Sequence, residues 1–563
     1  MNAYQPRASE HAHVLFDVLR ARDTLATLPA LAEHADTDLL TQVIEEAGKF
    51  VGEVVAPLNR EGDEVGAQWK DGSVTMPPGF RDAYQAFWQA GWPSLSSAPQ
   101  DGGQGLPAVM EAVLYEMLSA ANHGWTMAPG LLHGAYECLR HHGSEAIRAR
   151  YLGKLGSGEW LATMCLTEPH AGSDLGLVRT RATPRPDGRY TLNGTKIFIS
   201  GGEHDLSDNI VHLVLARLPD APPGPKGLSL FVLAKFDEHG QRSAVHCDRI
   251  EEKMGLHGSP TCVMRFDDAV AELVGEPGKG LNAMFVMMNA ARLHVGLQGI
   301  GLLDAAWQKA CAYAQERRQM RAPGSREAAD LIALHPAMQR ILRTQQAWIA
   351  TGRVVAYRTA LELDVLKHHP DATRREAAAR WCSLVTPVLK AAWTEQAFTG
   401  ASACLQVFGG HGYVREWGIE QHVRDARVAM IYEGTNEIQA IDLLLRKTLP
   451  DGAVALLALL DELHADLDGL PHAARAQDAL RGFGSFVRER LLPGTRAADA
   501  PADRAHWLAD DFLRACALLL MAWAATRLTA CARDDEASAA FWRFVWPEFG
   551  MRLNLLDATL DGA

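Results

Sequence analysis

The sequence predicts an α+β protein that is mainly helical. We expect an N-terminal helical domain, a central β-barrel or sheet domain, a C-terminal four-helix bundle and an extra C-terminal helical domain. Three observations predict this. The 563 residues exceed what one hydrophobic core usually organises. Helical spacing of apolar residues flanks a segment of short β-rich runs. The last part of the chain is rich in Ala and Leu and contains no lysine.

Residues 1–159 are predicted to form the N-terminal helical domain. Residues 38–55 and 109–121 carry apolar side chains three and four positions apart, the spacing that makes one face of a helix apolar. Gly and Pro at 76–79 and 99–107 separate the helices.

Residues 160–278 are predicted to form the middle β domain. Short runs rich in β-branched and aromatic residues lie at 190–200, 210–215, 228–233 and 261–266. Asn-Gly and Pro/Gly turns separate them. The middle of the chain therefore changes from helix to sheet.

Residues 279–450 are predicted to form the helical bundle, from long amphipathic segments at 281–317, 336–366 and 374–408. Residues 451–563 form the extra helical domain. They contain 11 arginines against 17 acidic residues. This acidic appendage is expected to pack either on the bundle or on a second subunit.

Composition excludes several classes of protein. The formal net charge of -13 opposes a phosphate backbone, so no nucleic-acid partner is expected. Nine cysteines without a CxxC pair give neither a disulfide framework nor a zinc site, which favours a cytoplasmic location and no metal. The N-terminus lacks a signal-peptide pattern. The most apolar run, residues 515–526, is far shorter than the roughly 20 residues that span a bilayer, so no integral membrane segment is expected.

One segment, MIYEGTNEIQ at residues 430–439, places a glutamate beside a helix start. Glu433 precedes Gly434 and an N-cap at Thr435 or Asn436. Taken alone, the pattern is more typical of a surface carboxylate favoured by the helix dipole. The residues by themselves do not establish a catalytic role.

Five motifs in order resemble those of the acyl-CoA dehydrogenase family. They are MCLTEPHAGSD at 164–174, KIFISGG at 196–202, ERRQ at 316–319, QVFGGHG at 406–412 and the segment at 430–439. The resemblance covers residues 50 to 450 and implies the family's fold, an FAD cofactor and an acyl-CoA substrate. It also implies that Glu433 is the catalytic base. Ala291 supports this, because the minority of members with the carboxylate on that helix have it at this position.

The resemblance assigns two groups of FAD contacts. Leu166 and Thr167 are expected on the pyrimidine side of the flavin, and Ser200 near N5. Phe198 stands where the family usually has tryptophan, so an aromatic face is kept and an indole donor is lost. The full set expected at the flavin is Cys165, Leu166, Thr167, Phe198, Ile199 and Ser200.

The second group implies a homo-oligomer, which we expect to be a dimer. Arg317 and Gln319 resemble the pair that reaches the FAD pyrophosphate of the neighbouring subunit, and arginine suits that anion because it donates two hydrogen bonds. Gln406, Gly409 and Gly410 resemble the segment that completes this pyrophosphate site. Thr435 and Glu437 match the positions that touch the adenosine portion of FAD, although several members have glutamine at the second position.

Four residues resemble the substrate contacts of the family. Ser173 and Arg292 are expected to contact CoA. Asn289 stands where some members have aspartate. Gly434 follows the base.

The implied reaction is FAD-dependent α,β-dehydrogenation of a fatty acyl-CoA to the trans-2-enoyl-CoA. Electrons would pass to electron transfer flavoprotein, as in fatty acid β-oxidation. The long N-terminal lead and C-terminal extension resemble a bacterial branch that includes 3-methylthiopropanoyl-CoA dehydrogenase, which is the alternative reading. An acyl-CoA oxidase and a non-catalytic DNA-associated flavoprotein are further alternatives, and the acidic, lysine-free tail speaks against the second.

Overall fold

The computed structural model describes residues 4–497, 501–531 and 535–562, without the side chains of residues 286, 289 and 535. The chain forms two compact units. Unit 1 comprises Met1–Lys49, Pro107–Ala121 and Val295–Ala563, and unit 2 comprises Phe50–Leu106 and Asn122–His294. Residues 1–159, predicted as one domain, are therefore shared between the two units.

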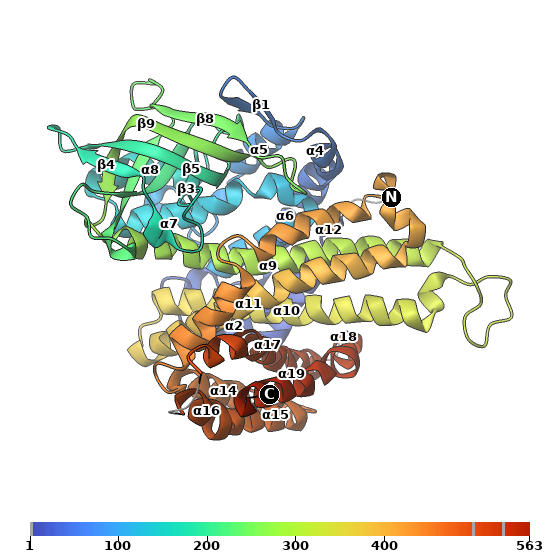
Figure 1. Cartoon of the computed structure of the whole chain (residues 1–563). Helices are drawn as coiled ribbons and strands as arrows, with labels where there is room; N and C mark the ends of the chain where they lie inside the picture. Colours follow the sequence, from blue (N-terminus) through green and yellow to red (C-terminus); the bar gives the residue numbers. More distant parts are fainter. Residues whose placement is uncertain (1–3, 498–500, 532–534, 563) are drawn as a thin grey trace. The chain divides into compact units, whose positions relative to one another are not determined.

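Unit 2 carries the sheet and short helices (Figure 1). Its helices and turns, with η for short 3₁₀ or π segments, are η3 (Val51–Val55), η4 (Ala56–Leu58), α4 (Asn59–Val65), α5 (Phe80–Gln89), η5 (Trp92–Ser94), η6 (Pro99–Asp101), η7 (Pro129–Leu131), α7 (Leu132–His142), α8 (Glu145–Ser157), η8 (Leu175–Leu177) and η9 (Pro225–Gly227). Its strands are β1 (Gln68–Lys70), β2 (Ser73–Thr75), β3 (Leu161–Cys165), β4 (Arg181–Pro184), β5 (Tyr190–Ser200), β6 (Ile210–Arg217), β7 (Leu228–Ala234), β8 (Val245–Ile250) and β9 (Thr261–Val274).

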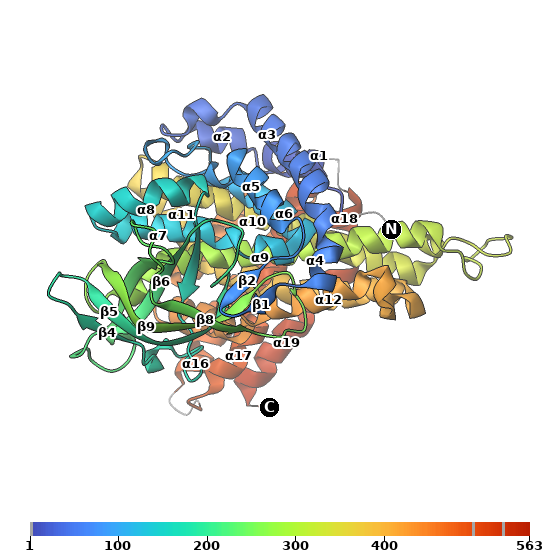
Figure 2. The same cartoon turned by 90° about the horizontal axis from the view of Figure 1, so that it is seen from above.

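The sheet of unit 2 closes on itself. Its strands follow the order β3-β6-β4-β5-β9-β7, and β7 also pairs with β6, so five strands form a ring. Strand β3 adds to β6 in parallel. Strand β8 adds to β9 antiparallel, and these two strands are labelled side by side in Figure 2. All seven residues of β7 are buried, and all of them except Ser229 are apolar. The predicted β-barrel or sheet domain is confirmed.

Unit 1 is helical. Its first part contains α1 (Ala8–Ala12), η1 (His13–Val18), α2 (Ala21–Ala26), η2 (Ala32–His34) and most of α3 (Thr37–Phe50). Helices α6 (Ala108–Thr126) and α9 (Gly280–Glu316) contribute residues to both units. The remaining elements before the extension are η10 (Ile332–Leu334), α10 (Pro336–His368), α11 (Ala372–Val407), η11 (Gly409–Tyr413), η12 (Arg415–Trp417), α12 (Ile419–Arg427), η13 (Val428–Met430), α13 (Asn436–Ile441) and η14 (Asp442–Thr448).

Helix α6 is interrupted where the chain leaves unit 1. Asn122 has φ -158 and ψ 87, which is extended rather than helical backbone. Its side-chain oxygen accepts a hydrogen bond from the N–H of Trp125 at 3.0 Å, so the helix starts again directly afterwards.

A buried ionic network ties the start of the chain to unit 1. Arg353 on α10 is 2% exposed and donates to Glu116 on α6 at 2.5 Å and to Asp304 on α9 at 2.6 Å. It also pairs with Glu10 of α1 at 3.0 Å. Because removal of one partner from such a network leaves an uncompensated buried charge, the network fixes α1, α6, α9 and α10 together.

The C-terminal extension packs on the bundle of the same chain. It consists of α14 (Val454–Asp466), α15 (Ala474–Phe486), η15 (Val487–Leu491), α16 (Leu492–Arg496), α17 (Arg504–Ala530), α18 (Asp535–Ala540), η16 (Phe541–Val545) and α19 (Pro547–Asp561). Trp523 of α17 meets Trp381 of α11 edge to face at 5.6 Å between centroids. Arg514 of α17 lies over Trp348 of α10 and pairs with Glu548 at 2.9 Å. Of the two expected positions, packing on the bundle and packing on a second subunit, the structure shows packing on the bundle.

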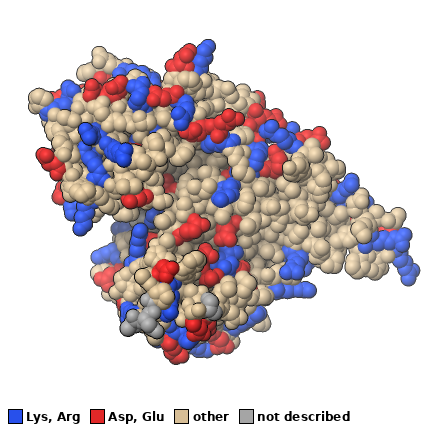
Figure 3. Space-filling view, in the orientation of Figure 1, with Lys and Arg blue, Asp and Glu red and all other residues tan. Residues whose placement is uncertain are grey.

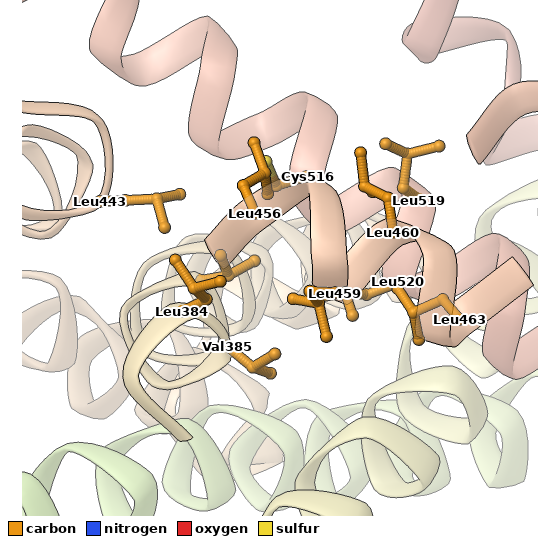
Figure 4. Close-up of a pocket in the computed structure, with 11 residues that line it drawn as sticks. Leu384, Val385, Leu443, Leu456, Leu459, Leu460, Leu463, Cys516, Leu519 and Leu520 are labelled. Carbon is orange, nitrogen blue, oxygen red and sulfur yellow. The ribbon is translucent and has the colours of Figure 1, made fainter. Parts of the chain in front are cut away.

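A small apolar cavity lies in the seam between the extension and the bundle (Figure 4). Its volume is about 20 Å³, room for about one water-sized sphere. It is a packing gap between leucine-rich faces. Its lining residues are Leu384, Val385, Val388, Leu443, Leu456, Leu459, Leu460, Leu463, Cys516, Leu519 and Leu520.

Two surface properties bear on the predicted partners. Within the described part of the chain, no helix has the length and apolar character to cross a membrane. On the face shown in Figure 3, acidic and basic side chains of the described residues are interspersed, without a continuous basic surface that would attract a phosphate backbone.

The N-terminus of α6 is capped by a carboxylate with an unusual pKa. Asp364 of α10 accepts hydrogen bonds from the N–H groups of Ala108 at 2.8 Å and Val109 at 3.4 Å. Burial raises its pKa to about 7 despite these bonds. In the folded protein the group therefore binds a proton more tightly than in the unfolded chain.

We expect Asp364→Asn to change how stability depends on pH. The stabilisation that comes from the raised pKa is complete below about pH 4 and is lost as pH rises through about 7. The difference in free energy of unfolding between the variant and wild type should therefore shift by on the order of 2 kcal/mol in favour of the variant from pH 5 to pH 8. Urea unfolding at the two pH values measures this. The matched control is Asp371→Asn at the exposed N-cap of α11; an equal pH response in both variants would contradict the prediction.

Candidate functional site

In unit 2, strand β5 presents an aromatic ring to the outside. The pairing of β5 with β9 shifts register between Lys196 and Ile199. Phe198 lies within this bulge with φ 58, a left-handed conformation that is rare for a bulky residue, and it is 60% exposed. Ile199 beside it is buried and Ser200 is half-buried. The bulge thus aims an apolar ring away from the barrel core.

Half-buried donors follow the end of strand β3. The Thr167 carbonyl accepts a hydrogen bond from the N–H of Ile197 at 2.9 Å. Among the described residues, neither the N–H nor the hydroxyl of Thr167 donates a hydrogen bond. Leu166 beside it is also half-buried. Because half-buried donors are normally satisfied, this segment is suited to a ligand with acceptor atoms.

One buried lysine joins the two segments. Lys196 Nζ donates to the Leu166 carbonyl at 2.9 Å and to Glu168 at 2.8 Å. Burial alone would raise the pKa of Glu168, but the Lys196 ammonium and bonds from Thr180 hold it below its usual range. Burial lowers the pKa of Lys196, against the attraction of Glu168. The pair fixes the segment after β3 relative to β5.

The other predicted residues of unit 2 differ in how they can reach a ligand. The Cys165 thiol is buried, contacts the Thr163 hydroxyl at 3.3 Å, and has its pKa raised by burial to about 11. Ser173 lies on an exposed loop. Arg292 is half-buried on α9, and its Nε is buried without an acceptor. Among the described residues its guanidinium forms no hydrogen bond or ion pair. The side chain of Asn289 lies outside the described residues.

In unit 1, Glu433 lies on a backbone turn that is unfavourable for it. Glu433 has φ 53 and Gly434 has φ 83, two consecutive left-handed residues between η13 and α13. Such a conformation costs of order 1–3 kcal/mol for a residue other than glycine and persists only where its surroundings enforce it. Thr435 is the N-cap, and its hydroxyl accepts from the Ile438 N–H at 3.4 Å.

Buried polar side chains enforce this turn. Lys390 Nζ donates to the Gly434 carbonyl at 2.7 Å and to Asn436 Oδ1 at 3.0 Å. Gln439 Nε2 donates to the Glu433 carbonyl at 3.1 Å. Before the turn, the Tyr432 hydroxyl donates to Gln298 on α9 at 2.6 Å. Burial raises the pKa of Tyr432 well above its ordinary value, so the phenol stays protonated.

The remaining predicted residues gather at the end of the bundle formed by α9 and α11. Arg317 and Gln319 follow α9, and both are exposed. Within the described residues, no acceptor pairs with the side chain of Arg317. Gln406 is exposed at the end of α11, and a Cβ added to Gly409 or Gly410 would meet nothing within 4 Å.

Stacked rings hold this end in place. Tyr313 stacks on Phe408 at 4.2 Å between centroids, and His411 stacks on Trp417 at 4.4 Å. The Tyr313 hydroxyl also hydrogen-bonds with His411 Nδ1 at 2.8 Å. Glu437, exposed on α13, has its pKa lowered by the Thr435 hydroxyl.

The predicted residues thus form sets in separate units. Residues 165–167, 173, 198–200 and 292 belong to unit 2, and residues 317, 319, 406, 409, 410, 433–435 and 437 belong to unit 1. No group of three or more His, Cys, Asp or Glu among the described residues is arranged to hold a metal ion. Sequence analysis did not predict the positioning roles of four residues: Lys196, Lys390, Asn436 and Gln439. A lone lysine in the apolar run at residues 388–393 was the available signal for Lys390.

Comparisons with known proteins agree over most of the chain. Three family models match in order: the acyl-CoA dehydrogenase N-terminal domain at residues 37–159, the middle domain at 163–269 and the C-terminal domain at 278–447. A 3-methylmercaptopropionyl-CoA dehydrogenase of Ruegeria pomeroyi is 44% identical over 447 residues, which are 77% of this chain and 76% of that protein. A broad-specificity linear acyl-CoA dehydrogenase of Mycobacterium tuberculosis is 33% identical over 500 residues, 83% of this chain and 79% of that protein.

A solved structure supports the fold over most of the chain. The acyl-CoA dehydrogenase complexed with FAD from Bacillus anthracis has a TM-score of 0.74 at 21% identity. The match covers 93% of this chain and 87% of that one, so it extends into the C-terminal extension.

We expect Gly434→Ala to destabilise the turn at Glu433. A Cβ at this φ of 83 would lie 2.7 Å from Gln439 Nε2, which is held by the Glu433 carbonyl. The strain alone should cost roughly 1–2 kcal/mol. The matched control is Gly482→Ala on α15, where a Cβ meets nothing within 4 Å and should stabilise by up to about 1 kcal/mol. Thermal unfolding of both variants measures the change in stability. Equal changes in the two variants would contradict the prediction.

Proposed function

The chain belongs to the acyl-CoA dehydrogenase family, and we propose that Glu433 is the base that removes the α-proton of its acyl-CoA substrate. The protein is thus a flavoprotein oxidoreductase acting on the CH–CH bond of an acyl-CoA, with FAD as its cofactor. The observation that carries the proposal is the enforced left-handed turn at Glu433. Strain of this kind concentrates where a side chain is held for chemistry.

The residues present fit FAD. Thr167 offers an N–H and a hydroxyl that donate to nothing else in the described chain, and the Phe198 ring is exposed on its bulge. These groups suit a flavin, which has acceptor atoms on one side and a flat aromatic face. Cys165 can contribute only backbone atoms, since its thiol is buried. Leu166, Ile199 and Ser200 complete the flavin segment.

The base must act on a weakly acidic carbon. A thioester α-proton can be removed by a carboxylate only if the developing negative charge on the thioester oxygen is stabilised. We assign that role to the backbone N–H of Glu433, with Gly434 allowing close approach of the substrate. A half-buried carboxylate is a stronger base than an exposed one. When bound, FAD supplies the acceptor for the β-hydride.

The CoA part has its own contacts. Arg292 carries a positive charge without a partner in the described chain, so it is available for the phosphate groups of CoA. Ser173 on its exposed loop is assigned to the same part of the substrate, and Asn289 remains a predicted contact.

The pyrophosphate part of FAD is assigned across a subunit boundary. No acceptor among the described residues pairs with the side chain of Arg317, and a Cβ on Gly409 or Gly410, at the same end of the bundle, would meet nothing within 4 Å. Gln319 and Gln406 are assigned to the same part of FAD, and Thr435 and Glu437, which follow the base, are assigned to its adenosine portion. Because Arg317 and Gln319 resemble the pair that reaches the FAD of the neighbouring subunit, a second copy of the chain is proposed to complete the site, in a homodimer.

Two substrate classes compete. The 44% identity to the Ruegeria pomeroyi enzyme supports a short thioether acyl-CoA such as 3-methylthiopropanoyl-CoA, and the 33% identity to a linear acyl-CoA dehydrogenase supports a fatty acyl-CoA. Because the identity to the Ruegeria pomeroyi enzyme is higher, we rank the thioether acyl-CoA as the first candidate substrate. Electron transfer flavoprotein as electron acceptor, a place in β-oxidation and a cytoplasmic location stay predictions.

We expect acyl-CoA to bleach the flavin absorbance anaerobically, and Glu433→Gln to lower that rate at least about 10³-fold, since it removes the general base. The panel contains 3-methylthiopropanoyl-CoA and linear acyl-CoAs from short to long. The matched control is Glu489→Gln, an exposed glutamate of η15, which should bleach at the wild-type rate. A flavin-loaded wild type that no thioester bleaches would contradict the proposed function. Hydrogen peroxide formed at the rate of turnover in air would indicate an oxidase.

We expect two inactive variants to complement each other. In a dimer that combines one Glu433→Gln chain with one Arg317→Met chain, one site keeps both its own base and the arginine of the other chain. Co-expressed chains with different tags should therefore recover about a quarter of wild-type turnover after random pairing. The control pairs Glu433→Gln with a chain that carries both substitutions, which restores nothing. Absence of complementation in purified mixed dimers would show that Arg317 does not act across the interface.

A further inference from the structure

A lysine without any solvent exposure lies in the middle of α11. Lys390 is 0% exposed and follows Val388 and Leu389 in an apolar stretch of the helix. A buried ammonium loses its hydration, which costs several kcal/mol unless hydrogen bonds and charges compensate. The groups that accept its hydrogen bonds therefore indicate the role of this lysine.

Those partners belong to the turn that carries Glu433. Lys390 Nζ donates to the Gly434 carbonyl at 2.7 Å and to Asn436 Oδ1 at 3.0 Å. Asn436 is itself held, because its Nδ2 donates to the Ala391 carbonyl at 3.0 Å and its Oδ1 accepts from the Thr394 hydroxyl at 3.2 Å. Lysine and acceptor are thus fixed on one face of α11.

The turn needs such an anchor. Left-handed φ values of 53 and 83 at Glu433 and Gly434 place both carbonyls where no helix or strand bonds them. Gln439 Nε2 satisfies the Glu433 carbonyl at 3.1 Å and reaches the Gly434 carbonyl only at 3.4 Å. The shorter, charge-assisted bond to Gly434 comes from Lys390.

We propose that Lys390 is a positioning residue for the base, because its ammonium holds the Gly434 carbonyl and thereby fixes the left-handed Glu433–Gly434 turn. The inference rests on the proposed role of Glu433. It assigns to α11 the orientation of the carboxylate and of the Glu433 N–H that faces the thioester oxygen.

The positive charge has a second effect. A cation beside the turn favours the ionised form of nearby carboxylates, as it does for Glu437, whose pKa is lowered first by the Thr435 hydroxyl and also by Lys390 and Arg427. Loss of the ammonium should therefore raise the pH at which the base becomes active. A residue that only fills space would not change this pH.

Lys390→Met tests the inference, because it keeps an unbranched side chain only one atom shorter and removes the ammonium. The matched control is Lys447→Met on η14, which also loses a lysine that donates to a backbone carbonyl, that of Ser383 at 2.8 Å. Measurements on the FAD-loaded proteins are kcat, KM, exchange of the substrate α-proton in D₂O, and the acidic limb of the pH profile.

We expect Lys390→Met to lower kcat and α-proton exchange about 100-fold, with KM changed less than about threefold, because a small misplacement of a reacting group has this effect. The acidic limb should move up by about half a pH unit or more. Lys447→Met should stay within about twofold of wild type. A Lys390→Met enzyme with wild-type kcat and an unmoved limb overturns the inference. A wild type without activity on any thioester would instead count against the proposed function.

If Lys390→Met does not retain FAD, the pH profile of Asn436→Asp tests the inference instead. This variant keeps the acceptor for Lys390 and adds a negative charge beside the ammonium, at the loss of the Nδ2 bond to the Ala391 carbonyl. The acidic limb should then move up at nearly unchanged FAD content, and an unmoved limb overturns the inference.

Discussion

The compensation of buried positive charge underlies much of this structure. Lys196, Lys390 and Arg353 are at most 2% exposed, and an unpaired charge at such a depth would cost several kcal/mol. Each cation is therefore bonded to atoms far away in the sequence. Arg353 joins α1, α6 and α9 to α10, Lys196 joins the segment after β3 to β5, and Lys390 joins α11 to the turn before α13. The bonded groups have little freedom to move, because a displacement that breaks these hydrogen bonds would leave the buried charge uncompensated.

Two of these cations lie beside strained backbone. Phe198 has φ 58 two residues after Lys196, and Glu433 has φ 53 one residue before the carbonyl that Lys390 holds. Both residues belong to the sets assigned to cofactor and reaction. A left-handed conformation of a large side chain is unfavourable on its own, so rigid surroundings must supply the difference. In both units a buried lysine with two hydrogen-bond acceptors provides part of that rigidity.

Local patterns in the sequence were enough to predict the elements. The mostly apolar sequence of β7 and the amphipathic periodicity of α10 predict a strand and a helix directly, and the N-cap predicts the helix start after Glu433. The partners of Lys390 could not be predicted in this way, because they lie 44 and 46 residues away and depend on how α11 meets the turn. Residues 1–159 also contribute to both compact units, which no local pattern indicates. Buried charge pairs such as Glu116 with Arg353 join residues 237 positions apart within one of these units.

The position of the extension bears on where a second subunit can bind. Helix α17 covers parts of α10 and α11 through Trp523 and Arg514, so these faces of the bundle are occupied by the chain itself. The end of the bundle near Arg317 differs. There Met320 is 79% exposed and Tyr413 is 89% exposed, on turns anchored by the Tyr313 and Phe408 stack. Apolar side chains held at such exposure on a rigid support are typical of a surface that is covered in an assembly. At the same end, no acceptor in the described part of the chain pairs with the side chain of Arg317, so a neighbouring copy that covered this end would bring its own groups close to the arginine.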